Sequence, residues 1–150
     1  MTLPWPDLSG RLAEVGHLLP VRVYFEDTDF SGRVYHAAYL KFMERGRSDF
    51  LRLRGIHHDA LAAEGRLAFA VRRMSIEFLK GATIDEVLEV ETRIASLQGA
   101  RVVVAQRVLR GQEALVTAEA MVALVDERGR PKRLSAAIQS RLRSSPPKPP

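Results

Sequence analysis

Two kinds of periodicity meet in the stretch Arg22-Val-Tyr-Phe-Glu-Asp-Thr-Asp-Phe-Ser-Gly-Arg-Val-Tyr-His-Ala-Ala-Tyr39. Apolar residues alternate with polar ones at its start and recur at helical spacing from its end onward. The junction carries three acidic residues, a glycine and a histidine, namely Glu26, Asp27, Asp29, Gly32 and His36. A carboxylate there would lie beside the free backbone N–H groups of a helix start, which can hold a developing oxyanion. The stretch predicts a hydrolytic site that uses neither a serine or cysteine nucleophile nor a metal ion.

The residues before the junction predict an arm and one strand. Apolar and polar side chains alternate through residues 21–26, and this period of two is typical of a half-buried strand. Residues 27–35 are expected to form a loop that contains Gly32. Residues 1–19 mix proline, glycine and polar side chains, and we expect a loose N-terminal arm with a short helix near residues 8–15.

Residues 37–54 form the one long helix that the pattern predicts. Their apolar side chains define a face: Tyr39, Met43, Gly46, Phe50 and Leu53, widened by Leu40 and Leu51. A glycine costs a helix about 1 kcal/mol relative to alanine. The place of Gly46 on the apolar face therefore indicates close packing of the helix backbone, for instance against a sheet. Gly55 is a typical helix stop, and a short helix is expected at residues 58–64.

The rest of the chain reads as four strands joined by turns that contain glycine. They are expected at residues 68–79, 86–97, 101–110 and 114–126. Short turns join the last three, which predicts an antiparallel meander. A strand, a long helix and then a run of strands is an α+β order. We expect an antiparallel sheet of about five strands with one long helix lying on it, within a single domain spanning residues 20–127.

Composition excludes several classes of protein. The chain has 150 residues and no cysteine, so disulfides and thiolate metal sites are impossible. The longest strongly apolar run, residues 120–125, is far shorter than the ~20 residues that span a bilayer. The N-terminus lacks the pattern of a signal peptide, so we expect a cytoplasmic protein. Serine-nucleophile, nucleotide-binding and dinucleotide-binding motifs are missing, and adjacent His57 and His58 make a poor metal site. We expect no metal and no cofactor, and an exposed His17.

The net charge of +5 is concentrated at the C-terminus. Residues 128–150 carry seven basic and no acidic side chains, whereas the first 127 residues carry 16 basic and 18 acidic ones. We expect a solvated, partly disordered tail that stays out of the core, and no nucleic-acid binding. Leu134, Ile138 and Leu142 permit a short basic amphipathic helix there. Such a helix would suit a membrane surface or an acidic partner.

Residues 21–47 resemble the 4-hydroxybenzoyl-CoA thioesterase family, and more closely its Tol-Pal-associated acyl-CoA thioesterase branch. The matching segments are Arg22–Asp29, Gly32, Val34–Ala37, Tyr39 and Phe42–Arg45, followed downstream by Phe69–Phe78 and Asp85–Glu91. The similarity extends over roughly residues 20–127. It implies the hotdog fold, in which an antiparallel sheet wraps around one long helix, and it agrees with the order of elements expected above.

The resemblance also implies the roles of several residues. Asp29 matches the family's active-site aspartate, as nucleophile or as base toward water, and the backbone N–H of His36 would polarise the thioester carbonyl. Substrate-binding positions would be Gly32, Tyr35, Val71, Gly99, Ala100 and Arg101, the last three on the phosphate side of CoA. CoA would lie across a subunit interface of a homodimer or homotetramer. Two departures are Arg33, where relatives usually have an apolar residue, and Gly46, where alanine is typical.

Other interpretations of the same residues remain open. Asp29 alone would also suit a structural helix cap, and neighbouring Glu26 and Asp27 are expected to raise the pKa of Asp29. Glu44, two turns into the helix, is a competing base. The whole protein could instead bind acyl-CoA without hydrolysing it, as a sensor or scaffold.

Overall fold

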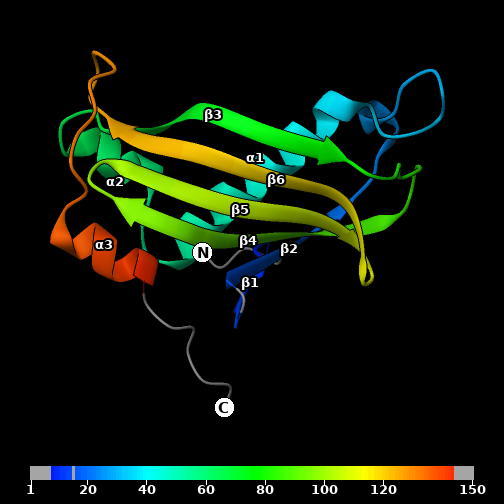
Figure 1. The fold of residues 1–150 in the computed structure, drawn as a ribbon, viewed down its shortest axis with the longest axis horizontal. Coiled ribbons are helices and arrows are strands. Elements are labelled where there is room, and N and C mark those ends of the chain that lie inside the picture. Colours follow the sequence, from blue (N-terminus) through cyan, green and yellow to red (C-terminus); the bar gives the residue numbers. More distant parts are fainter. Residues whose placement is uncertain (1–7, 15, 144–150) are drawn as a thin grey trace, which may run out of the picture.

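The computed structural model describes residues 8–14 and 16–143, which form a six-stranded antiparallel sheet with one long helix across it (Figure 1). The strands are β1 (Arg11–Ala13), β2 (Gly16–Arg22), β3 (Ala68–Phe78), β4 (Val87–Gln98), β5 (Arg101–Arg110) and β6 (Glu113–Val125). The helices are the short 3-10 turn η1 (Phe25–Asp27), α1 (His36–Leu53), α2 (His58–Ala63) and α3 (Ala136–Arg143). The strand order is β1-β2-β4-β5-β6-β3, so β1 and β3 form the two edges.

The expected α+β architecture is confirmed. The long helix and the four strands after it begin and end within about two residues of the expected positions. The β4-β5-β6 meander is present, and β3 lies antiparallel to β6. The sheet has six strands in the described residues rather than about five, because β1 adds to the edge.

The N-terminal expectations are wrong in two places. Residues 11–13 form β1 instead of a helix, while residues 1–7 and 15 of the expected arm lie outside the described residues. The next strand, β2, begins at Gly16 and ends at Arg22, so Phe25 lies in η1 and is 82% exposed. Asp27 explains the early end, because its carboxylate accepts a 2.8 Å hydrogen bond from the Tyr24 amide. This local turn outweighs the alternating pattern.

The helix α1 packs on the sheet through a face that is close to the expected one. Its buried residues are Ala38, Tyr39, Phe42, Met43, Gly46 and Phe50. Leu40 and Leu53 are partly exposed instead, and Phe42 occupies the core. Gly46 confirms the expected close approach: a Cβ atom there would lie 2.8 Å from Val90 Cγ1 and 3.0 Å from Thr92 Oγ1. The absence of a side chain at this position brings the helix backbone against β4.

The tail joins the core, contrary to expectation. Ile138 and Leu142 do lie one turn apart on a helix, α3, whereas Leu134 precedes that helix. Leu134 and Leu142 are each only 3% exposed and pack in one cluster with Phe50. Arg141 also donates a 2.7 Å hydrogen bond to the Gly55 carbonyl. The apolar side is therefore occupied, and contact with a membrane or an acidic partner would depend on exposed basic side chains alone. The Pro-rich end, residues 144–150, lies outside the described residues.

His17 is buried rather than exposed, and it ties the N-terminal strands to α1. Its Nε2 atom lies 2.6 Å from Asp49 Oδ2, which also accepts a 2.8 Å hydrogen bond from the Gly10 amide. The ring meets Phe50 edge-on at 5.9 Å. Burial lowers the pKa of His17, against the opposing effect of Asp49. A histidine of this kind belongs to the core, and its sequence position alone gave no sign of that.

Across residues 8–14 and 16–143, no helix is long and apolar enough to cross a membrane.

Candidate active site

A small hairpin immediately before α1 carries Asp29. Thr28 and Val34 pair as an antiparallel bridge, and the Asp29 amide donates a 2.9 Å hydrogen bond to the Arg33 carbonyl. The turn closes with a 2.9 Å bond from the Gly32 amide to the Asp29 carbonyl. Gly32 has a φ of 79°, a conformation that glycine adopts without strain. The hairpin thus presents Asp29 at its tip.

The Asp29 carboxylate is exposed and held by Ser31. Its Oδ1 atom accepts hydrogen bonds from the Ser31 amide at 2.8 Å and from the Ser31 hydroxyl at 2.6 Å. These bonds hold the pKa of Asp29 below its usual range. The expected rise, from the charges of Glu26 and Asp27, is therefore wrong, because direct hydrogen bonds to the carboxylate outweigh nearby exposed charges. Asp29 is ionised at neutral pH.

The start of α1 lies next to this carboxylate. The N-cap residue is Tyr35, not Asp29, so the interpretation of Asp29 as a helix cap is wrong. Within the described chain no side chain caps α1, and its first turn has no acidic residue. Because the first amides of a helix have no partner inside the helix, the His36 amide at its start is suited to bind an oxyanion. An electrostatic interaction with His36 also lowers the pKa of Asp29, which places the two side chains near one another.

Aromatic rings border the same end of the helix. The Tyr35 ring lies 4.5 Å from the His36 ring, and Phe78, at the end of β3, meets His36 edge-on at 6.0 Å. Tyr35 and Phe78 are each about half exposed. An apolar surface therefore adjoins the carboxylate and the helix start. Sequence reasoning missed Phe78, because only the fold brings the end of β3 to the start of α1.

The hairpin is attached to the connection between β3 and β4. The Val34 amide donates a 2.9 Å hydrogen bond to the Ala82 carbonyl, and Arg33 pairs with Thr83 in an isolated bridge. Ala82 is fixed in turn, because its amide donates to the Tyr39 hydroxyl at 3.1 Å. Arg33, the departure from the family pattern, extends over Gly81: a Cβ atom on Gly81 would lie 3.3 Å from Arg33 Cδ.

Some of the predicted substrate-binding residues do not meet Asp29 within one chain. Gly99 and Ala100 form the β4–β5 turn, and Arg101 begins β5. The end of the sheet near the Asp29 hairpin is marked by Arg110, whose side chain reaches Gly81. The nine residue steps of strand from Arg101 to Arg110 span about 30 Å. Val71 likewise lies seven residues along β3 from Phe78.

A mostly apolar cavity of about 100 Å³ lies between α1 and the sheet. Val71 lines it together with Phe69, Phe50 and Leu142, and Glu44 is among its polar residues. Glu44 accepts a 2.9 Å hydrogen bond from the Ser48 hydroxyl. Sequence reasoning did not find this cavity, although the leucine spacing in the tail was a signal that α3 covers something apolar. In the part of the chain that the structure describes, no three histidine or acidic side chains converge to hold a metal ion.

An antiparallel sheet on one long helix, with a carboxylate where that helix begins, is the architecture of hotdog-fold thioester hydrolases. Residues 31–117 match the family model of the thioesterase superfamily. The chain therefore belongs to that superfamily.

Curated relatives include the acyl-CoA thioester hydrolase YbgC of Escherichia coli O6:H1, which is 45% identical over 108 residues, covering 71% of this chain and 80% of that protein. The acyl-CoA thioesterase YbgC of Haemophilus influenzae is 42% identical over 111 residues, 74% of this chain and 82% of that protein. These relatives confirm the resemblance to the Tol-Pal-associated branch.

Solved structures agree with this assignment. A probable thioesterase from Bartonella henselae superposes with a TM-score of 0.77 at 50% identity, covering 79% of this chain and 98% of that one. A thioesterase from Thermus thermophilus, complexed with coenzyme A and Zn, has a TM-score of 0.72 at 26% identity, covering 85% of this chain and 97% of that one.

Proposed function

We propose that this protein hydrolyses acyl-CoA thioesters, with Asp29 as the reacting carboxylate and the His36 amide as oxyanion donor. The observation that carries the proposal is the pairing of an ionised, exposed Asp29 with the uncapped start of α1. The names of the YbgC relatives supply the substrate class. Gly32 and Tyr35 flank the reacting groups, and their contact with substrate is part of the proposal.

The hydrogen bonding of Asp29 favours a nucleophilic role. Ser31 donates both of its bonds to Oδ1, and among the described residues Oδ2 has no partner. A low pKa keeps a nucleophile ionised, whereas a general base gains from a pKa nearer 7. Asp29 attacks the thioester carbonyl carbon, the C–S bond breaks, and the CoA thiolate leaves and takes a proton from water. Water then adds to the mixed anhydride, which yields the free acid, restores the carboxylate and releases one proton, and that proton neutralises the hydroxide left when the thiolate was protonated.

A thiol-release assay with acyl-CoAs of varied chain length tests this proposal. We expect turnover with at least one chain-length class. Specific binding of acyl-CoA without release of thiol from any substrate would instead support the alternative, a non-catalytic acyl-CoA-binding protein.

A homodimer joined through the β3 edges would complete the site. No strand of the described chain pairs with the outer side of β3. An eleven-residue open edge is a strong site for pairing with a second copy. Antiparallel pairing about the middle of β3 places the Val71 end of one protomer beside the Phe78 end of the other. This reversal would bring the distant substrate-binding residues of one protomer toward Asp29 of its partner.

We therefore predict a dimer or a tetramer in solution. Light scattering coupled to size-exclusion chromatography at micromolar concentration measures the mass directly. A variant with proline at Ser75, in the middle of the β3 edge, should shift the protein toward monomer and reduce turnover together. A wild-type monomer that remains fully active would contradict the shared site.

Arg101 is predicted to bind the phosphates of CoA. Its side chain is exposed at the β4–β5 turn, and it makes no hydrogen bond or ion pair to the rest of the described chain. Arginine holds phosphate oxygens with two parallel N–H groups, far from the reacting carbonyl. We expect Arg101→Ala to raise KM for acyl-CoA by roughly 10-fold with kcat nearly unchanged. Small thioesters without the nucleotide serve as the control, and their kinetics should not respond.

A further inference from the structure

The connection between β3 and β4, residues 79–86, is the support on which the Asp29 hairpin rests. It receives the Val34 amide at the Ala82 carbonyl, 2.9 Å away, and pairs Thr83 with Arg33. It contains one glycine and one alanine, and few apolar anchors of its own. Its fixed points include the bond from the Ala82 amide to the Tyr39 hydroxyl and the bond from the Asp85 amide to the Val23 carbonyl, at 2.8 Å.

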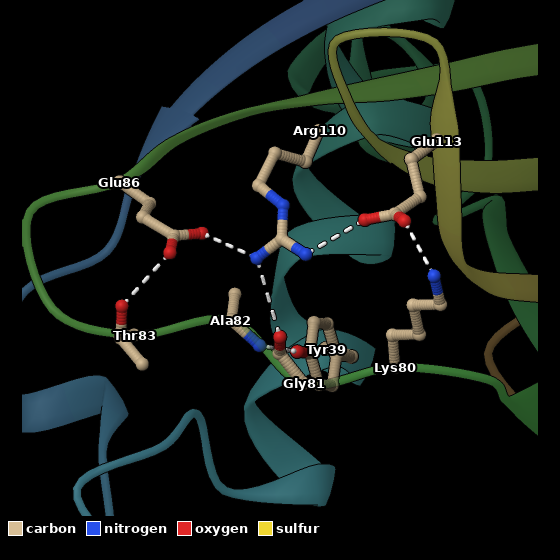
Figure 2. A network of polar contacts seen from close by, with 8 residues as sticks. All are labelled: Tyr39, Lys80, Gly81, Ala82, Thr83, Glu86, Arg110 and Glu113. Carbon is tan, nitrogen blue, oxygen red and sulfur yellow. Dashed lines mark hydrogen bonds and ion pairs between the residues drawn. The ribbon is translucent and has the colours of Figure 1, made fainter.

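The side chain of Arg110, the last residue of β5, reaches this connection and lies between Glu86 and Glu113 (Figure 2). Its Nη1 atom donates to Glu86 Oε2 at 3.0 Å and to the Gly81 carbonyl at 3.4 Å. Its Nη2 atom donates to Glu113 Oε1 at 2.7 Å. One guanidinium thus joins the β3–β4 connection to the start of β6.

Two further side chains close this network around the loop. Lys80 Nζ lies 2.6 Å from Glu113 Oε2, and the Thr83 hydroxyl donates to Glu86 Oε1 at 2.8 Å. Hydrogen bonds from Arg110 and Thr83 hold the pKa of Glu86 below its usual range, and bonds from Lys80 and Arg110 do the same for Glu113. Both carboxylates stay charged at neutral pH, so the network persists under working conditions.

The network differs from a simple surface ion pair in the number of groups that one side chain joins. Arg110 is 37% exposed at its side chain, and its planar fork bonds three acceptors from two separate segments. Gly81 is next to Ala82, whose carbonyl accepts the hydrogen bond from the Val34 amide of the hairpin. A movement of the guanidinium therefore changes the position of the connection at the point where the hairpin is attached.

We propose that Arg110 is a positioning residue, which fixes Asp29 and the start of α1 relative to one another through Glu86, Glu113 and the β3–β4 connection. The expected effect on kcat rests on the proposed function, whereas the expected effect on the position of the hairpin does not. Arg110 does not touch the reacting atoms; it acts through Ala82 and Val34. Small displacements of a reacting group cost large factors in rate, so loss of this support affects kcat more than substrate binding.

The test compares Arg110→Met with Arg107→Met. Arg107 lies three residues earlier on the same strand and also binds a carboxylate with two hydrogen bonds, at 2.8 and 3.0 Å to Glu91. Among the described residues its side chain makes no hydrogen bond or ion pair to the connection, which makes it a matched control. We expect Arg110→Met to lower kcat by about 10-fold with KM changed less than about twofold, and Arg107→Met to lower neither. Arg110→Lys should restore only part of kcat, because lysine cannot bond all three acceptors in one plane.

Hydrogen exchange of the Val34 and Ala82 amides provides a readout that does not depend on activity. Both amides should exchange at least about tenfold faster in Arg110→Met than in Arg107→Met, at similar melting temperature. Unchanged exchange would overturn the proposal even if the wild-type enzyme is active. Faster exchange with kcat equal to that of Arg107→Met would also overturn it. A wild-type protein without thioesterase activity would end the proposed function, and the exchange data would still decide whether Arg110 holds the hairpin.

Discussion

Asp29→Asn is expected to remove acyl-CoA hydrolysis, with a loss in kcat of roughly 10²–10⁴-fold or more. The side-chain oxygen of asparagine can still accept the hydrogen bonds that the Ser31 amide and hydroxyl give to Oδ1. The hairpin should therefore keep its shape. An uncharged amide is neither a nucleophile nor a base at neutral pH. Steady-state thiol release by the purified variant, beside its melting temperature, separates lost chemistry from lost folding.

Two matched variants make this prediction specific. Asp27→Asn changes an acid two residues away whose carboxylate accepts the Tyr24 amide, and it should reduce turnover far less. Glu44→Gln tests the competing base, which lies in the polar lining of the cavity and accepts the Ser48 hydroxyl. Near-wild-type turnover in Asp29→Asn would exclude the carboxylate mechanism. An inactive Glu44→Gln beside an active Asp29→Asn would move the catalytic role into α1.

Much of the fold was predictable because its signals are local. The four strands after α1 alternate or carry β-branched residues between glycine turns, and α1 carries its own period and a glycine stop. Gly46 added a tertiary prediction, since a glycine on an apolar helix face has few reasons other than close packing. That prediction is confirmed by the approach of Val90.

The errors share a physical cause, namely contacts between residues distant in sequence. His17 is buried because Asp49, on α1, offers it a hydrogen bond across 32 residues of chain. The tail is packed because α1 and the sheet leave an apolar surface that Leu134 and Leu142 cover. The spacing of Leu134, Ile138 and Leu142 indicated an apolar side in the tail, but no local pattern shows which surface that side covers, and none shows that His17 is buried. The candidate site shows the same division: a loop carrying Asp29 is a local feature and was predicted, whereas its pairing as a hairpin, Phe78 and the network around Arg110 come from the fold.

The placement of the predicted substrate-binding residues relative to Asp29 could not be predicted from the sequence, because it depends on the proposed homodimer. Val71 and Arg101 were assigned to substrate binding by resemblance alone, and one chain places them far from Asp29. No pattern within one sequence indicates where a second protomer would bind. The open edge of β3 is therefore the first physical indication of where the two halves of a shared site would meet in the proposed homodimer.

Truncation after Asp126 is expected to cost most of the stability of the domain, contrary to what the basic composition of the tail suggests. Leu134 and Leu142 are almost fully buried, and each buried leucine contributes about 2–3 kcal/mol relative to an exposed one. Their loss also uncovers Phe50 and the neighbouring apolar cavity, which Leu142 lines. We expect the melting temperature to fall by more than about 10 °C. Differential scanning calorimetry or circular dichroism measures this directly.

The effect should depend on the leucines and not on the charges. Replacing Arg128, Arg133 and Arg143 with glutamine leaves the apolar contacts intact, and the melting temperature should move by no more than about 2 °C, as for other exposed substitutions. Leu134→Ala combined with Leu142→Ala keeps every charge and should reproduce most of the loss.

The truncation also removes the Leu134 amide, which donates a 3.1 Å hydrogen bond to the Gly99 carbonyl in the turn beside Arg101. KM for acyl-CoA should therefore rise in the truncated protein at temperatures where it is still folded. A truncated protein with unchanged melting temperature would show that α3 contributes nothing to the core, and the solvated tail expected from composition would then be correct.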